Sequence, residues 1–370
     1  MIFDNIEKVF NEHIKQERLT GADCAIYQND KEIYRGVFGY SDCAQSKPLK
    51  HNAIFRLASM TKPITAVAVL IAQEHGLLDI DEPLGKYIPN FHHSGVGKLI
   101  DGNPRFVCAA REVVLRDCLC HCSGFGSGSL GDFQLKRIKK TYSLEENVMS
   151  WNGAFLDFMP RSKQAYSAVV AFELLALVVE KVSGTSFDKF LKKEIFEPLG
   201  MTETKYVLSE DEKLRLVEMA KTGVSGKLEK VDLGFSGFGS FKEGYTGGSA
   251  GLFSTIADYS NFARMLACKG IFNGKKIINK DSVVKMRTTE SIIDEYQSWG
   301  LGVRVITKQD ERQPLPISSF GWSGAYGTHF WIEPDTGISA VLMINKADVG
   351  GSGSVYSREF EKIVSKRNLS

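Results

Sequence analysis

The sequence predicts an α/β sandwich, in which an antiparallel sheet is flanked by helices and an all-helical domain is inserted. Strand-like runs lie towards both ends of the 370-residue chain, whereas helical patterns dominate its middle. The chain is also long for one compact core. We therefore expect residues 1–76 and 221–370 to form the sandwich domain, and residues 77–220 to form the inserted helical domain.

The first 76 residues show alternating helical and strand-like patterns, separated by turn signals. The expected elements are a helix over 3–18, strands over 24–28 and 32–38 joined at Asn29-Asp30, a short strand over 53–58, and a helix from Met60 to about Gly76. Glycine at the end of the last helix favours its termination there.

The middle of the chain is mostly helical, and strand patterns return after residue 300. The clearest helix, over 168–183, is apolar nearly all round and is therefore expected to be buried. The other expected elements are glycine-rich loops over 124–131 and 234–251, a helix begun by Thr255 and Asp258, strands over 300–306, 329–332 and 339–344, and a last helix over 355–366.

Composition points to a protein that handles small molecules. The chain is 43% hydrophobic and 24% charged, with a formal net charge of +2, so no general field attracts nucleic acid or anionic lipid. A short basic run over 136–140 fits a solvated helix face. No run of 18 apolar residues occurs, so we expect no membrane span. No interface motif is readable, which leaves the oligomeric state open.

The N-terminus and the cysteines favour a cytoplasmic protein. The first 19 residues are amphipathic and charged, without the apolar core of a signal peptide, unless a leader has been removed. Seven cysteines is an odd number, which suits a reducing compartment. Cys118, Cys120 and Cys122 are too tightly spaced for a usual zinc site and lack a distant second pair. We expect no metal and no organic cofactor.

The sharpest local signal is Ser59 followed three residues later by Lys62 at a helix start. Both side chains then project from one face. Unpaired N–H groups and the positive end of the helix dipole lie beside such a serine. A desolvated lysine can be neutral and accept the hydroxyl proton. The pattern fits a nucleophile and its base, although Ser-x-x-Lys alone also fits a serine that only caps the helix.

Six short segments then occur in order along the chain: FRLASMTK (55–62), DCLCHCSG (117–124), YS (166–167), IFEPLGMT (195–202), GGSAGLFST (247–255) and GWSG (321–324). Together they resemble the superfamily of serine β-lactamases, penicillin-binding proteins and family VIII carboxylesterases, especially its class C branch. The resemblance covers about residues 20–345. It implies a β-lactamase/transpeptidase-like fold and an active site between the two domains.

The resemblance also implies roles for individual residues. Ser59 would be the acylated nucleophile, Lys62 its proton partner, and Tyr166 the tyrosine that relays protons. The backbone N–H groups of Ser59 and Ala325 would form the oxyanion hole. Trp322, Ser323 and Gly324 would form the strand that borders the substrate.

Two departures from the β-lactamase pattern favour esters. Ala168 replaces the asparagine of Tyr-x-Asn, and Trp322 replaces the lysine of Lys-Thr-Gly. The first loses an amide that would hold a β-lactam or peptide, and the second loses a cation that would attract a carboxylate. A neutral ester suits such a site better than an anionic amide. Tryptophan at this position also resembles the family VIII esterases.

A second serine competes for the nucleophile role. Ser249 lies in Gly247-Gly-Ser-Ala-Gly251, which matches the nucleophile elbow of α/β-hydrolases, but the strand and helix this motif needs are not adjacent. We interpret Ser249 as a loop residue lining the site. His121, by resemblance, packs a loop, and Arg56 and His329 are interpreted as structural, although His329 is close enough in sequence to Gly324 to reach substrate.

The sequence thus predicts a serine hydrolase that acts on small carboxylic esters through an acyl-enzyme. Amide chemistry on the same residues, as in a β-lactamase or a D-amino-acid peptidase, and acyl transfer to an alcohol or amine are the nearest alternatives. A catalytically silent binding protein with the same fold is the alternative from another class.

Overall fold

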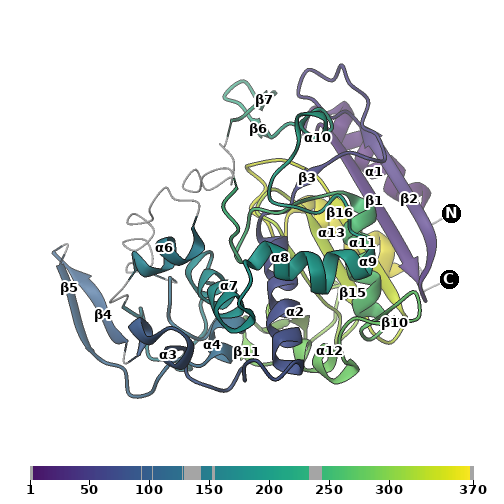
Figure 1. Cartoon of the computed structure of the whole chain (residues 1–370). Helices are drawn as coiled ribbons and strands as arrows, with labels where there is room; N and C mark the ends of the chain where they lie inside the picture. Colours follow the sequence, from purple (N-terminus) through teal and green to yellow (C-terminus); the bar gives the residue numbers. More distant parts are fainter. Residues whose placement is uncertain are drawn as a thin grey trace.

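A single antiparallel sheet of eight strands, built from both ends of the chain, is the centre of the fold (Figure 1). The computed structural model describes residues 3–92, 94–101, 103–126, 128, 143–151, 155–232 and 244–366. The strand order is β11-β12-β13-β14-β15-β16-β1-β2. The strands span β1 Gly21–Gln28, β2 Lys31–Gly39, β11 Ser291–Ile292, β12 Gln297–Trp299, β13 Arg304–Ile306, β14 Phe320–Ser323, β15 His329–Glu333 and β16 Ile338–Met343.

The N-terminal hairpin joins the C-terminal strands because β1 pairs with β16, where Ile26 lies opposite Ala340. The turn between β1 and β2 contains Asn29 and Asp30, whose φ angles are +47° and +68°. These residue types tolerate that conformation, which matches the twist of a two-residue hairpin. The predicted hairpin and its turn are confirmed.

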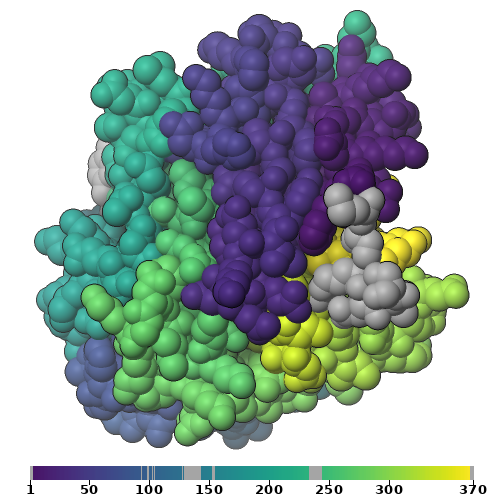
Figure 2. Space-filling model, turned by 90° about the vertical axis from the view of Figure 1, so that its right-hand side faces the viewer, coloured from purple at the N-terminus to yellow at the C-terminus, as the bar shows by residue number. Residues whose placement is uncertain are grey.

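Helices cover both faces of the sheet. On one face, α1 (Asp4–Lys15) and α13 (Val355–Ser365) pack Phe10 and Phe360 against Trp331 of β15. Phe330, the residue before Trp331 in β15, points to the opposite face and packs with α11 (Ile256–Ala267). Figure 2 shows N-terminal residues (purple) and C-terminal residues (yellow) side by side on the surface of this part of the molecule.

Two apolar helices form the centre of the main core. These are α2 (Thr61–Glu74), buried from Thr61 to Ala72, and α7 (Val170–Ser183), buried from Val170 to Val179. The other helices among the described residues are η1 Ala58–Met60, α3 Leu84–Tyr87, η2 Pro89–Phe91, α4 Leu115–Leu119, α6 Leu144–Met149, α8 Phe187–Leu191, η3 Lys192–Phe196, α9 Glu197–Leu199, α10 Glu210–Lys213 and α12 Lys280–Met286. The antiparallel sheet with its flanking helices confirms the predicted fold class.

The segment expected to be all-helical also contains a hairpin. Strands β4 (Gly95–Ile100) and β5 (Asn103–Cys108) pair with each other over six residue pairs and project from the helices (Figure 1). The sequence signal is Asp101-Gly102, a dipeptide that favours tight hairpin turns. Smaller pairs elsewhere are β3 Phe55–Arg56 with β8 Phe253–Ser254, β6 Ala220–Thr222 with β7 Leu228–Lys230, and β9 Ile271–Phe272 with β10 Lys275–Lys276.

Close packing shortens one predicted strand. Instead of a strand over 300–306, Gly300 and Gly302 form a turn, and β13 begins at Arg304. Gly302 has a φ of +72°, and a Cβ there would lie 2.5 Å from the Cβ of Ala66 in α2. A side chain at this position is therefore excluded by the helix that carries Lys62.

The structure does not test several of the predictions made from the sequence. The domain boundaries after residues 76 and 220 stay predictions. The basic run over 136–140 lies outside the described residues, as do parts of the glycine-rich stretches over 124–131 and 234–251. None of the helices in the described part of the chain combines the length and the apolar character needed to cross a membrane.

Candidate active site

Ser59 lies at a junction held from two sides. The short helix η1 (Ala58–Met60) lies between β3 and α2. Ser59 is buried in it, with 6% of its surface exposed. Ala58 has a φ of +47°, which is uncommon for a residue with a Cβ and is maintained only where the surroundings hold it. The Leu57 N–H donates to Leu252 O at 3.0 Å, which ties this segment to the start of β8.

Lys62 is fully buried and reaches Ser59 from the first turn of α2. Its Nζ lies 3.2 Å from Ser59 Oγ, 2.6 Å from Ala168 O and 2.9 Å from Ser249 O. Two of its three neighbours are carbonyl oxygens, which only accept hydrogen bonds. When the amine is neutral, its two N–H groups satisfy these carbonyls, and the lone pair is left to face the Ser59 hydroxyl.

Tyr166 lies next to this pair and belongs to an aromatic group. Lys62 Nζ is 5.2 Å from the centre of its ring. The ring stacks on Trp299 at 5.7 Å and tilts against Trp322 at 5.3 Å. The Tyr166 hydroxyl is buried, and the described part of the chain offers it no hydrogen-bond partner. An unsatisfied buried hydroxyl is costly in a native structure, which makes it a candidate for a contact with substrate or water.

His121 holds the segment that carries Tyr166. Its Nδ1 accepts a hydrogen bond from the Ser167 N–H at 3.1 Å, and its carbonyl accepts one from the Ala165 N–H at 3.0 Å. Burial, followed by the nearby charge of Lys62, places the pKa of His121 well below its usual value. A neutral ring with Nδ1 as acceptor follows, which agrees with the interpretation of His121 as a residue that packs the loop.

The segment from Trp322 to Ala325 crosses close to Ser59. A Cβ on Gly324 would lie 2.2 Å from Leu57 O, so this position has room only for glycine. Trp322 contacts Trp299 at 4.6 Å between ring centres, and its buried Nε1 has no acceptor among the described residues. Ala325 packs beside Ala58 in a small apolar cluster. The structure therefore brings the predicted bordering strand and both predicted oxyanion residues to one place.

Ser323 points away from Trp322, as alternation along a strand requires. Its Oγ lies 2.7 Å from His329 Nδ1, and His329 Nε2 lies 3.0 Å from Glu361 Oε1 of α13. Arg304 donates to the same carboxylate oxygen at 2.7 Å. Arg304 and the hydrogen bond from His329 hold the pKa of Glu361 at about 2, although burial opposes them. His329 thus belongs to a buried network between the sheet and α13.

Ser249 is fully buried, and its hydroxyl donates to Glu173 Oε1 at 2.5 Å. The hydroxyl is therefore engaged with a carboxylate, whereas the Ser249 carbonyl is the part that contacts Lys62. Sequence reasoning did not identify Glu173. Its signal is present, since it is the one charged residue in the apolar run over 169–179. Trp299, which stacks on Tyr166, was missed as well because it lies in a strand too short to show a pattern.

The remaining candidates have packing contacts. Arg56 Nη1 donates to Val217 O at 3.3 Å, and its guanidinium lies 5.8 Å from the centre of the Phe253 ring. Cys118 belongs to the main core, and Cys120 and Cys122 pack with Trp299, so all three are buried. Within the described ranges, no group of three or more His, Cys, Asp or Glu side chains is arranged to hold a metal ion.

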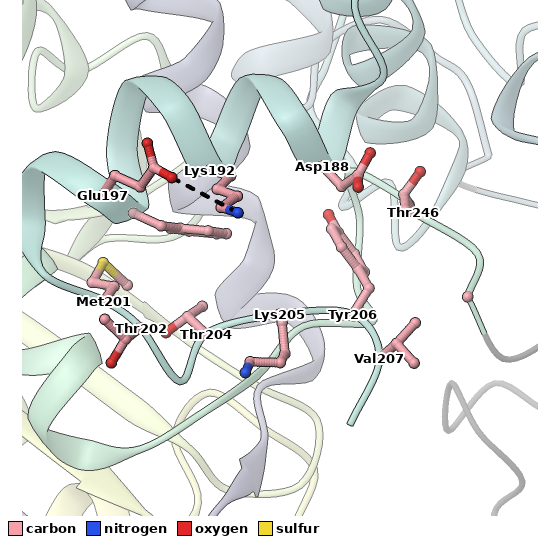
Figure 3. Close-up of a pocket in the computed structure, with 12 residues that line it drawn as sticks. Asp188, Lys192, Glu197, Met201, Thr202, Thr204, Lys205, Tyr206, Val207 and Thr246 are labelled. Atoms are coloured by element: carbon pink, nitrogen blue, oxygen red, sulfur yellow. Dashed lines mark ion pairs between the residues drawn. The ribbon is translucent and has the colours of Figure 1, made fainter. Parts of the chain in front are cut away.

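A separate pocket of about 530 Å³ lies between helices α8–α9 and the segment over 201–207 (Figure 3). Phe196, Met201 and Tyr206 line it, together with the ion pair between Lys192 and Glu197. Neither Ser59 nor Lys62 is among its lining residues. The Tyr206 hydroxyl donates to Gly247 O at 2.7 Å, so the wall of this pocket supports the loop that carries Ser249.

Comparisons with known proteins show the family and the fold of this chain. The Beta-lactamase family model matches residues 6–357. Protein Rv1367c of Mycobacterium tuberculosis is 26% identical over 352 residues, which cover 88% of this chain and 86% of the relative. Esterase EstB of Burkholderia gladioli is 26% identical over 373 residues, covering 94% and 91%. The solved structure of EstCE1, described as a hydrolase with promiscuous acyltransferase activity, superposes with a TM-score of 0.81 at 23% identity, covering 98% of each chain. The chain is therefore a member of the Beta-lactamase family.

Proposed function

We propose that this protein is a serine hydrolase that acts on small carboxylic esters through a covalent acyl-enzyme. Family membership and the similarity to Esterase EstB support a hydrolase. The observation that carries the finer assignment is the surroundings of Lys62, whose amine contacts two carbonyl oxygens and the Ser59 hydroxyl. A cytoplasmic location is part of the same proposal and is tested by cell fractionation.

In the first step, Ser59 attacks the ester carbonyl. Its Oγ forms the new bond to carbon, and its proton moves to Lys62 Nζ, 3.2 Å away. The charge that develops on the carbonyl oxygen is stabilised by the N–H groups of Ser59 and Ala325, and such donors are worth a few kcal/mol each. The bond to the alcohol then breaks, and the alcohol leaves with a proton delivered through Tyr166. Water releases the acyl group by the reverse set of transfers.

The aromatic group around Tyr166 supports a neutral ester as the substrate. Trp322 and Trp299 present flat apolar surfaces beside it, and the Trp322 N–H is a neutral donor. Ala168 contributes its backbone carbonyl to Lys62, while its side chain is a methyl group that forms no hydrogen bond. A substrate carboxylate would find no matching cation in this group of side chains.

The test is hydrolysis of p-nitrophenyl acetate and butyrate by the wild type, Ser59→Ala and Ser249→Ala. We expect Ser59→Ala to lower kcat by about 10⁴-fold or more, as loss of a nucleophile does. Ser249→Ala keeps the carbonyl that contacts Lys62 and should retain most of the activity. Loss of activity in Ser249→Ala alone would overturn the assignment.

Three further readouts separate the alternatives. Opening of a chromogenic cephalosporin faster than ester hydrolysis would replace the ester class by amides. Failure of a fluorophosphonate probe to label the folded wild type would favour a catalytically silent protein. Product formed with an added alcohol or amine acceptor would show acyl transfer in place of hydrolysis.

A further inference from the structure

The loop over 245–251 is pressed against α7 by close backbone contacts. A Cβ on Gly248 would lie 2.2 Å from Phe172 O, and a Cβ on Gly247 would lie 2.7 Å from both carboxylate oxygens of Glu173. Glycine at both positions therefore lets the loop backbone approach the helix. The Thr65 hydroxyl of α2 donates to Gly248 O at 2.7 Å, so the loop is fixed to both buried helices.

Glu173 is the polar group at the centre of this contact, and it is fully buried. Its Oε1 accepts hydrogen bonds from the Ser249 N–H at 3.0 Å and from the Ser249 hydroxyl. Its Oε2 accepts one from the Tyr245 hydroxyl at 2.6 Å, which in turn accepts from Asn147 Nδ2 at 2.8 Å. Three donors directed at one carboxyl group suit its ionised form, which only accepts hydrogen bonds.

Ser249 connects this carboxylate to Lys62. The Ser249 N–H and hydroxyl face Glu173, whereas its carbonyl oxygen accepts from Lys62 Nζ at 2.9 Å. Glu173 therefore sets the orientation of the peptide group that holds one of the Lys62 hydrogens. The arrangement also compensates charge, because Lys62 and Glu173 are both fully buried, and buried charges are stable only when paired.

Two other buried titratable groups near this pair, His121 and Tyr245, do not supply this charge. His121 is neutral, since burial and Lys62 place its pKa well below the usual value. Tyr166, at 5.2 Å from Lys62 to the ring centre, carries a hydroxyl without a partner in the described chain. Burial and Glu173 raise the pKa of Tyr245 well above its usual value, so Tyr245 stays a neutral donor. Burial raises the pKa of Glu173 above its usual value, although the hydrogen bonds from Ser249 and Tyr245 and the charge of Lys62 oppose this rise.

We propose that Glu173 is a positioning residue that controls when Lys62 accepts the Ser59 proton, acting through the Ser249 peptide group and through its own charge. This inference rests on the proposed function. As the Ser59 Oγ–C bond forms, the proton moves to Lys62 Nζ, and the resulting ammonium is stabilised by the Glu173 carboxylate. The proton then leaves with the alcohol through Tyr166, and Glu173 itself gains and loses none.

The experiment is the pH profile of kcat/KM for ester hydrolysis by Glu173→Gln. The amide keeps the shape and an acceptor for Ser249 but removes the charge. Without the carboxylate, the ammonium form of Lys62 is less favoured, so the neutral amine persists to lower pH. We expect the acidic limb of the profile to move to lower pH by about one unit or more, since opposite charges have effects of this size. The plateau should fall about tenfold because the ammonium formed in the transition state is less stabilised.

Glu180→Gln is the matched control. Glu180 lies on the same helix, is partly buried, and its Oε1 accepts from the Phe187 N–H at 2.7 Å, away from the 245–251 loop. It loses the same charge, and its profile should coincide with that of the wild type. A Glu173→Gln profile that falls uniformly without moving, or that moves to higher pH, would overturn the inference.

Tyr245→Phe decides the matter if Glu173→Gln does not fold, because it removes one donor that stabilises the ionised carboxyl group, so that Glu173 carries less negative charge at the pH of the acidic limb. Its acidic limb should move in the same direction by a smaller amount, and a profile identical to the wild type would contradict the proposal. Failure of the proposed function is distinct, since the wild type would then be inactive on esters or Ser59→Ala would remain active.

Discussion

At the residue scale, the environment of Lys62 supports the proposal that this buried amine acts as a base next to Ser59. Its carbonyl neighbours come from Ala168 and Ser249, on either side of the site. Both are backbone atoms, so the side chain at position 168 can vary while its contact persists, whereas the Ser249 side chain is engaged with Glu173. In the proposed mechanism, the backbone atoms that position Lys62 are therefore distinct from the side chains of Ala168 and Trp322, which we expect to face the substrate.

His121 provides a residue-scale prediction. In His121→Phe the ring still packs between Trp299 and Phe172, but the acceptor for the Ser167 N–H is lost. A displaced Tyr166 should lower kcat by about 10- to 100-fold, since small misplacements of reacting groups have such effects. Steady-state kinetics across pH are the measurement. The acidic limb should stay in place, unlike that of Glu173→Gln, because His121 is neutral, and an unchanged kcat would show that the Ser167 contact is dispensable.

At the element scale, the end of β14 is positioned by its contact with the segment before η1. The Gly324 N–H donates to Thr328 O at 2.7 Å, and the Thr328 hydroxyl donates to Leu57 O at 3.1 Å. The turn between β14 and β15 therefore rests directly on the residue two positions before Ser59. This contact fixes the position of the Ala325 N–H relative to the Ser59 N–H, although the two residues come from distant parts of the chain.

Gly324→Ala tests this contact. The added Cβ would lie 2.2 Å from Leu57 O and from Thr328 Oγ1, so the two segments must separate. We expect a loss of about 1–3 kcal/mol in the free energy of unfolding, as for other overpacked sites, and a marked loss of kcat. Denaturant unfolding and ester hydrolysis measure both.

Gly184→Ala is the control for that variant. Gly184 ends α7 with a φ of +67°, and an added Cβ there meets nothing within 4 Å. It should cost about 1 kcal/mol in stability and leave kcat unchanged. Equal losses of kcat in both variants would mean that the Gly324 contact has no particular role at the site.

At the scale of the whole molecule, the sheet is joined to the C-terminal helix by the buried network of Arg304, His329 and Glu361. Glu361 Oε1 receives hydrogen bonds from both partners, at 2.7 and 3.0 Å. Both termini of the chain meet on this side of the sheet (Figure 1). The charge pair between Arg304 and Glu361 therefore couples the C-terminal strands to α13.

Glu361 predicts how stability depends on pH. Because its pKa is held at about 2 in the folded state, below its usual value, it stabilises the fold above the unfolded pKa, and this contribution is lost as pH falls from about 5 to 2. Glu361→Gln leaves Arg304 without its anion and should cost about 3–5 kcal/mol at pH 7. Denaturant unfolding at pH 7 and pH 3 should show the difference between variant and wild type narrowing at pH 3. A constant difference would contradict the pairing.

By itself, the sequence determined the order of the elements, the hairpin at Asn29-Asp30 and the placement of Ser59 and Lys62 on one helix face. These are local properties, because turn residues and apolar periodicity act within a few positions. Ordered motifs also sufficed for the family. The hairpin β4–β5 and the strands β11 and β12 were not predicted. Strands of two or three residues and glycine-rich segments show no clear hydrophobic period.

Only the tertiary structure decided which polar groups meet. The fold directs the Ser249 hydroxyl to Glu173 and the Ser249 carbonyl to Lys62. It also directs the Ser323 hydroxyl to His329, on the face of β14 opposite to the Trp322 side chain. Residues up to 187 positions apart form these contacts. Their pairing depends on how buried surfaces fit and on the cost of leaving a buried polar group unsatisfied, and neither is written in a local pattern.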